Sequence, residues 1–300
     1  MKEHAMAMKQ KADIIPFRRG ASLDDETEIP LASASSSVAP ADRDRLGPVA
    51  LDLTGKPKVW FLIGPNGSGK TALARWIGWN VAGEGRSVLM AALDPQNRSL
   101  ATWFSGVMQP DNNDGTQTAR WLRDFLQHAM DRMESAILDF GGGDTALAKL
   151  VNEAPDLDAV LAAAGVDAVA CYMIGPRVED LASLDALERA GFQPAATVIV
   201  LNEGRVDSTL SREEAFARVL RHGAFTRAVA RGAVVLWMPR LEPEVAAEIE
   251  GKRLTFGQAR DGQVPPGAKF APIGGFKRSM VRRWLDAMVQ EFGPIASWMP

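Results

Sequence analysis

The residues best suited to chemistry lie between positions 64 and 71, where the sequence is GPNGSGKT. The spacing of its glycines, lysine and threonine fits the phosphate-binding pattern G-x-x-x-x-G-K-[ST]. Glycine lets the backbone curl so that its N–H groups face an anion, Lys70 would reach the β- and γ-phosphates, and the Thr71 hydroxyl would bind Mg²⁺. The predicted nucleotide-binding residues of this loop are Gly64, Asn66, Gly67, Ser68, Gly69, Lys70 and Thr71.

The flanking sequence favours a phosphate-binding loop over a chance glycine-rich turn. Residues 59–63 (VWFLI) are apolar with β-branched and aromatic members, which predicts a buried strand. Residues 72–81 carry apolar side chains at helical spacing. The loop is therefore expected between a strand and a helix, where the N-terminal end of the helix adds its positive dipole.

Two carboxylates follow further predicted strands, Asp94 after residues 87–92 and Asp139 within the apolar run 136–140 that leads into three glycines. Because ligands of parallel sheets gather at the carboxyl ends of the strands, both are expected beside the phosphate site. We expect Asp139 to hold the water shell of the metal, and if hydrolysis occurs, Asp94 is the best available group to orient the attacking water. A structural alternative makes Asp94 a turn opener and helix cap. The candidate catalytic residues are thus Lys70, Asp94 and Asp139, and the candidate metal-binding residues are Thr71 and Asp139.

The rest of the chain alternates strands with helices, and these elements must position the site. Further strands are predicted at residues 166–174, 195–201 and 233–238, and helices at 99–107, 117–133, 145–151, 178–189 and 212–229. Strands joined through helices imply right-handed crossovers and a parallel sheet. The expected fold class is α/β, a three-layer P-loop NTPase fold with a mostly parallel sheet covered by helices on both faces. The turn-rich segment 110–115 is either a switch that closes over nucleotide or an ordinary surface loop.

The composition divides the chain into three parts. Residues 1–48 contain separate basic, acidic and serine-rich stretches with little periodic apolar surface, which predicts a flexible N-terminal arm, either a solvated tail or a docking peptide for a partner. Residues 49–250 form the predicted nucleotide-binding domain. The remaining residues, 251–300, form a basic C-terminal segment with a terminal amphipathic helix that is expected to pack on the same domain.

This C-terminal segment carries eight basic and three acidic residues, a net charge of +5. Phe276, Met280, Trp284 and Met288 recur every four residues and predict the apolar stripe of a helix. Docking of that helix on its own core is one interpretation. Contact with a phosphate backbone and binding to a membrane surface are the others. The candidate DNA-binding residues are Lys277, Arg278, Arg282 and Arg283.

The composition as a whole excludes some classes of protein. A net charge of −3 and a pI of about 5.8 do not suit a general polyanion binder, so any nucleic-acid contact would come from a local patch. The single cysteine, Cys171, excludes a disulfide framework and indicates a reducing compartment. No apolar run approaches the length of a membrane span, and the N-terminus lacks a secretory signal. We therefore expect a cytoplasmic protein without a membrane span.

The order of these motifs resembles the ParA/MinD group of P-loop ATPases, of the SIMIBI class, over roughly residues 58–240. The resemblance lies in the phosphate loop, in residues 88–97 (VLMAALDPQN), in the metal-site strand 137–145, and in the strand 198–202 (VIVLN) with its preceding strand and helix. It implies ATP and Mg²⁺ as cofactors, Asn202 as the residue that recognises adenine, a homodimer, and a protein partner. The implied role is a nucleotide switch in plasmid or chromosome partition or in DNA transfer.

The sequence departs from that group at two positions. Pro65 stands where the group has a signature lysine that reaches across a dimer, and Ala92 replaces the aspartate that positions water. The leading hypothesis is a Mg-dependent ATPase that acts as a nucleotide switch. The alternative is a nucleotide-binding adaptor with little or no hydrolysis. A third hypothesis, a small-molecule kinase or ligase, needs an acceptor pocket for which the sequence has no signature.

Overall fold

The computed structural model describes residues 51–93, 100–111, 114–143, 145–207 and 209–300. The chain divides after Arg43, and all described residues belong to the second unit, Asp44–Pro300. The predicted N-terminal arm, residues 1–48, lies outside the described residues. Candidate residue Asp94 also lies outside them, as do the surrounding residues 95–99.

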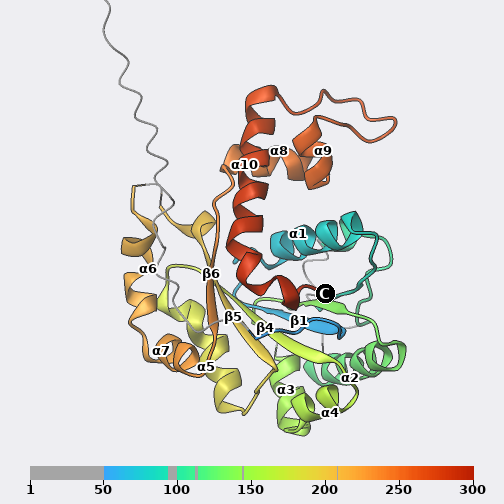
Figure 1. Cartoon of the computed structure of the whole chain (residues 1–300), viewed down its shortest axis with the longest axis vertical. Helices are drawn as coiled ribbons and strands as arrows, with labels where there is room; N and C mark the ends of the chain where they lie inside the picture. The colour runs from blue at the N-terminus through green and yellow to red at the C-terminus, as the bar shows by residue number, and fades with distance from the viewer. Residues whose placement is uncertain (1–50, 94–99, 112–113, 144, 208) are drawn as a thin grey trace, which may run out of the picture. The chain divides into compact units, whose positions relative to one another are not determined.

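Six parallel strands form the sheet, in the order β2-β3-β1-β4-β5-β6 (Figure 1). Their bounds are β1 Lys58–Ile63, β2 Leu89–Ala92, β3 Ala136–Asp139, β4 Asp167–Ile174, β5 Ala196–Asn202 and β6 Val234–Met238. β1 lies between β3 and β4 and is buried along its whole length, because helices cover both faces of the sheet. The predicted α/β fold with a parallel sheet is confirmed.

The helices form a layer on each face of the sheet. One layer shares a core with Trp60 and Leu62 of β1 and consists of α1 (Lys70–Gly83), α8 (Pro243–Gly251), α9 (Phe256–Asp261) and α10 (Gly275–Phe292). The other packs against Val59 and Phe61, the alternate residues of the same strand. Its helices are α2 (Gly115–Arg132), α3 (Ala146–Glu153), α4 (Leu157–Ala163), α5 (Ala182–Arg189), α6 (Arg212–Leu220) and α7 (Gly223–Ala230).

The described residues also include short 3₁₀ turns. The turns are η1 Leu100–Thr102, η2 Val178–Leu181, η3 Glu203–Arg205 and η4 Gly293–Trp298.

Two of the predicted helices are wrong in extent. In place of a helix over 99–107 the structure has only η1, because Met108 pairs with the edge strand β2, donating to Met90 O at 2.8 Å and accepting from Ala92 N at 3.0 Å. The helix predicted at 212–229 is two helices, since the His222 side chain accepts from Ala224 N at 3.2 Å and caps α7.

The C-terminal part packs against β6 and β1 and is only partly as expected. Sequence patterning missed α8 and α9 altogether. Within α10, Trp284 is buried and its Nε1 donates to Pro239 O at 2.8 Å. Phe276, expected on the same apolar stripe, is 90% exposed, so the first turn of α10 does not share the buried face. Beyond α10, the Trp60 indole donates to Trp298 O at 2.6 Å, which fixes the chain end near β1 (Figure 1). No helix in the described part of the chain has both the length and the apolarity to cross a bilayer.

Candidate functional site

The loop between β1 and α1 has the backbone of a phosphate-binding turn. α1 begins at Lys70, and its N-cap, Gly69, has a φ of +101°, a left-handed conformation that favours glycine. A Cβ on Gly69 would lie 2.5 Å from Asn202 Nδ2, so the close approach of Asn202 also demands glycine. The Leu73 N–H donates to Gly69 O at 3.0 Å, closing the first helical turn. Within the preceding loop, Ser68 N donates to Pro65 O at 3.2 Å, so an anion at the start of the helix would compete with that carbonyl for the N–H group.

Lys70 lies inside this loop. Its side chain is only 7% exposed, and Nζ donates to Gly64 O at 2.8 Å and to Pro65 O at 2.9 Å. These bonds hold a positive charge against the loop backbone, where an incoming phosphate would compete with the two carbonyl oxygens for the ammonium group.

The structure brings together the two residues predicted to hold a metal. Thr71 Oγ1 donates to Asp139 Oδ2 at 2.7 Å. Asp139 is buried at the carboxyl end of β3, directly beside Leu62 of β1, so adjacent strands align the carboxylate with the start of α1. A hydroxyl and a carboxylate suit Mg²⁺, which prefers oxygen ligands and takes few of them from the protein. Thr71 and Asp139 therefore fit the predicted ion.

The glycines that follow β3 lie against the phosphate loop. Gly142 N donates to Asn66 Oδ1 at 3.0 Å. A Cβ on Gly142 would lie 2.2 Å from Asn66 N, closer than any side chain allows. The sequence run Gly141 to Gly143 therefore permits a backbone contact between two loops that both border the site.

Asn202 ties the end of β5 to the phosphate loop. Its Nδ2 donates to Ser68 O at 2.7 Å, its Oδ1 accepts from Gly204 N at 2.8 Å, and the residue is 7% exposed. Both ends of the amide are thus bonded to backbone. This is a positioning contact, and the adenine-recognition role that the resemblance implies for Asn202 stays a prediction.

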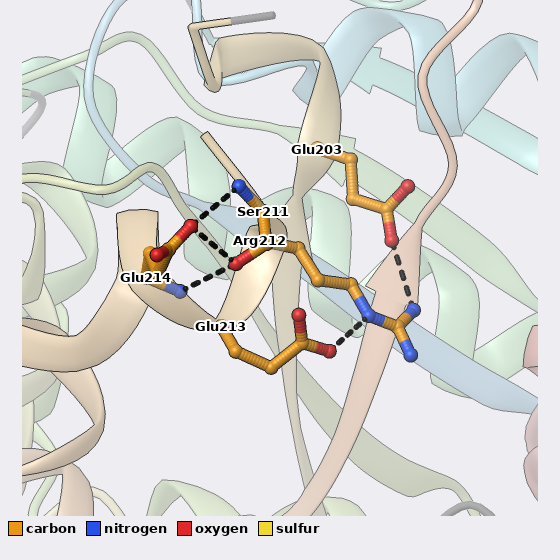
Figure 2. Close-up of polar contacts among 5 residues, drawn as sticks. All are labelled: Glu203, Ser211, Arg212, Glu213 and Glu214. Atoms are coloured by element: carbon orange, nitrogen blue, oxygen red, sulfur yellow. Dashed lines mark hydrogen bonds and ion pairs between the residues drawn. The ribbon is translucent and has the colours of Figure 1, made fainter. Parts of the chain in front are cut away.

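The turn η3, which follows β5, is held by ion pairs of Arg212 and places a second arginine, Arg205, over the phosphate loop. Arg212 donates to Glu203 at 3.0 Å and to Glu213 at 2.8 Å, which holds the turn η3 to the start of α6 (Figure 2). The Nη1 atom of Arg205, in the same turn, lies 3.2 Å from the position that a Cβ on Gly67 would take. Sequence reasoning missed Arg205, although its place three residues after Asn202 on a strand end was a usable signal.

A cavity of about 450 Å³ opens over the loop and continues past it. Its lining includes most of the predicted loop residues and Asp139, and then reaches Arg75, Trp103 and Glu250. No sequence pattern groups these three residues, because Trp103 follows η1 and Glu250 belongs to α8, which was not predicted. Arg75 could have been predicted, because it lies one helical turn after Thr71 on α1.

The predicted DNA-binding residues lie on α10, and none of them lines this cavity. Lys277 makes ion pairs with Glu244 and, at 2.8 Å, with Glu248. Arg278 is half-buried, whereas Arg282 and Arg283 are exposed. Arg282 and Arg283 are therefore the members of the predicted basic patch that are well exposed to solvent, and the charge of Asp261 acts on Arg282.

Protein-family models and curated proteins give no match to this sequence. Among solved structures, the chain is similar to the signal recognition particle receptor FtsY of Elizabethkingia anophelis in complex with GDP, with 18% identity over 64% of this chain and 59% of that chain, and a TM-score of 0.40. It is also similar to the MinC:MinD cell division complex of Aquifex aeolicus, with 12% identity over 77% of this chain and 96% of that chain, and a TM-score of 0.41. The chain thus spans less than two thirds of that FtsY chain.

The strand order and the loop define the class from this chain's own geometry. A six-stranded parallel sheet, a glycine-rich turn after its buried strand β1, and a carboxylate on the adjacent strand β3 form a P-loop nucleotide-binding architecture.

Proposed function

We propose that this protein binds a nucleoside triphosphate with Mg²⁺ and acts as a ParA/MinD-like nucleotide switch. The observation that carries the proposal is the 2.7 Å contact between Thr71 and Asp139 beside a loop that already contains the Lys70 ammonium group. Three groups with separate roles in phosphate binding meet there from one strand, β3, and one helix, α1. A structural role alone gives no reason for this combination at a helix N-terminus.

Each residue of the site has a separate role in nucleotide binding or in the reaction. Lys70 would exchange the carbonyls of Gly64 and Pro65 for phosphate oxygens, and the loop N–H groups would bind the remaining charge. Mg²⁺, when bound, would neutralise phosphate charge and orient the terminal phosphate. Thr71 would provide a ligand and Asp139 would orient the metal's waters. Asp94, outside the described residues, remains our candidate for orienting the attacking water.

ATP is the proposed nucleotide, on the resemblance of the motif order to ParA/MinD proteins. Titration calorimetry with ATP and with GTP, each with Mg²⁺, tests this for the wild-type protein and for Lys70→Ala. Loss of charge-assisted bonds worth about 1.5–3 kcal/mol each should weaken binding about 100-fold. Lys269→Ala, which removes an exposed lysine elsewhere, is the matched control. Equal affinity of wild type and Lys70→Ala would refute the assignment, and a preference for GTP would correct the nucleotide.

The second candidate function is an adaptor that binds ATP with little turnover. Pro65 and Ala92 favour it, because the residues that accelerate hydrolysis in the resembled group are absent at these positions. Measurement of phosphate release separates the two functions. A rate that disappears in Asp139→Asn supports the switch ATPase, whereas tight ATP binding with no release supports the adaptor.

We further propose that the switch serves partition or DNA transfer through the basic side of α10. Arg282 and Arg283 are exposed and available to phosphates, while Lys277 is neutralised by Glu244 and Glu248. Replacement of both arginines by alanine should weaken DNA retention and reduce its salt dependence, because each lost phosphate contact lowers the slope of log K against log salt by about one. Retention that does not respond to salt would contradict DNA binding.

A nucleotide-dependent homodimer and a protein partner in the cytoplasm complete the proposal. The dimer follows from the same resemblance, and the reducing location from the single cysteine in the sequence. Light scattering with ATP, ADP and no nucleotide tests the dimer directly. A mass that stays monomeric in all three conditions would exclude it.

A further inference from the structure

The cavity over the phosphate loop is longer than the loop itself. Beyond Thr71 it continues along α1 to a second group of residues, Arg75, Trp103 and Glu250. Arg75 follows Thr71 by one helical turn, so the two side chains lie on the same face of α1. A ligand in this cavity can therefore contact both ends of it.

Arg75 is a buried cation with few protein partners. Its side chain is 7% exposed. Within the described part of the chain, its polar contacts are a long hydrogen bond from Nη2 to Leu254 O at 3.4 Å and a loose ion pair from Nη1 to Glu250 Oε1 at 3.9 Å. A guanidinium group has five N–H donors, so most of those of Arg75 have no acceptor among the described residues. Burial accordingly lowers the pKa of Arg75 to about 10, because neighbouring charge does not offset the lost solvation.

Aromatic rings fix the orientation of this guanidinium group. Its central carbon lies 3.3 Å from the centroid of the Trp103 ring and 4.9 Å from that of Phe256. Stacking engages the faces of the guanidinium plane and leaves the in-plane N–H donors for an acceptor. Arg75 is thus held as a preorganised donor on the wall of the cavity, and planar forks of this kind match phosphate and carboxylate oxygens.

Glu250 is the only carboxylate near this donor that the described chain supplies, and it is weakly held. Its side chain is 66% exposed and its oxygen is beyond hydrogen-bond distance of Arg75. An exposed carboxylate at this distance contributes little attraction and can rotate into solvent. It therefore does not block an incoming anion, although its charge opposes one.

We propose that Arg75, stacked on Trp103, binds an anionic group, a phosphate or a carboxylate, in the same cavity as the phosphate loop. The anion comes either from the nucleotide itself, through one of its own phosphates, or from a second small molecule that binds beside the nucleotide. The first source rests on the proposed nucleotide binding. The second requires only the cavity, and it would supply the acceptor pocket that the sequence did not indicate.

Calorimetry on the full chain with two variants tests the subsite. ATP with Mg²⁺ is titrated first, and then inorganic phosphate and citrate are titrated into protein saturated with ADP. Arg75→Gln should weaken one of these by about tenfold or more, since it removes a charge-assisted contact. Glu250→Gln should change the same affinity in the opposite direction by about threefold, because it removes only a repulsive charge. Arg123→Gln, an exposed arginine on α2, is the control.

The affected ligand identifies the source. Loss of ATP affinity assigns the anion to the nucleotide, and loss of phosphate or citrate affinity with unchanged ATP binding assigns it to a second molecule. A folded Arg75→Gln protein with all three affinities unchanged overturns the proposal. If Arg75→Gln does not fold, Glu250→Gln decides: a gain supports the subsite and no change overturns it. If the wild-type protein binds no nucleotide but binds phosphate in an Arg75-dependent way, the proposed function fails and the subsite stands.

Discussion

Asn202 provides the sharpest single-residue test of how the phosphate loop is held. Truncation to alanine removes the 2.7 Å bond to Ser68 O and the 2.8 Å bond from Gly204 N. Each hydrogen bond contributes about 1 kcal/mol net, and a buried polar group left without a partner costs more. We therefore expect Asn202→Ala to lower the free energy of unfolding by about 2–3 kcal/mol. In a domain of this size that corresponds to a fall in Tm of about 4–10 °C.

The nucleotide should sense the same change. Without Asn202 the Ser68 carbonyl loses its anchor, so binding must also order the loop, and ATP affinity should fall about tenfold. Asn202→Asp should be more severe, because it keeps the acceptor for Gly204 N but places a carboxylate oxygen against Ser68 O. Thermal melts and calorimetry measure both effects, with Asn152→Ala on the exposed side of α3 as the control. The positioning role would be refuted if the Tm of Asn202→Ala lay within about 1 °C of the wild-type Tm, which corresponds to about 0.3 kcal/mol, and its ATP affinity lay within about twofold of the wild-type affinity.

Three further predictions concern the loops and one half-buried acid, Asp158. Gly142→Ala should displace Asn66 and weaken ATP binding in calorimetry, because the new Cβ would lie 2.2 Å from Asn66 N; unchanged binding would show that the two loops can separate freely. Arg205→Gln should lower ATP affinity about tenfold with no change in Tm, since Arg205 is exposed but lies over the loop; a change in Tm alone would assign it a structural role. Burial raises the pKa of Asp158, more than the Gln193 N–H lowers it, and Asp158 Oδ1 has no partner among the described residues. The folded state then binds the proton more tightly, so stability falls as pH rises from the ordinary aspartate value of about 4 through the raised pKa. Asp158→Asn should abolish this fall in urea unfolding between about pH 4 and about pH 8; a fall with pH that persists unchanged in Asp158→Asn would place its cause elsewhere.

Local sequence predicted those parts of the site that depend on neighbouring residues in the chain. The strand, the loop and Lys70 follow from one continuous motif. Asp139 was predictable because the carboxyl ends of parallel strands meet at one edge, and the structure places it 2.7 Å from Thr71. Arg205 needed one further step, from a strand end to the turn after it.

The rest depends on packing that no local pattern encodes. Trp103 reaches Arg75 because η1 packs against α1, and Glu250 reaches it from α8, a helix that sequence periodicity missed. Periodicity also assigned Phe276 to a buried stripe, yet it is 90% exposed, because spacing sets the face of a helix but not how far the core extends along it.

A crystal structure of the protein with Mg²⁺ and a non-hydrolysable ATP analogue tests the central claim most directly. We expect Lys70 Nζ to leave Gly64 O and Pro65 O and to bind the β- and γ-phosphate oxygens. Thr71 should bind the metal, and Asp139 should order the metal's water shell. A saturating concentration of nucleotide that leaves the loop unoccupied, with Lys70 still bonded to the two carbonyls, would contradict the account.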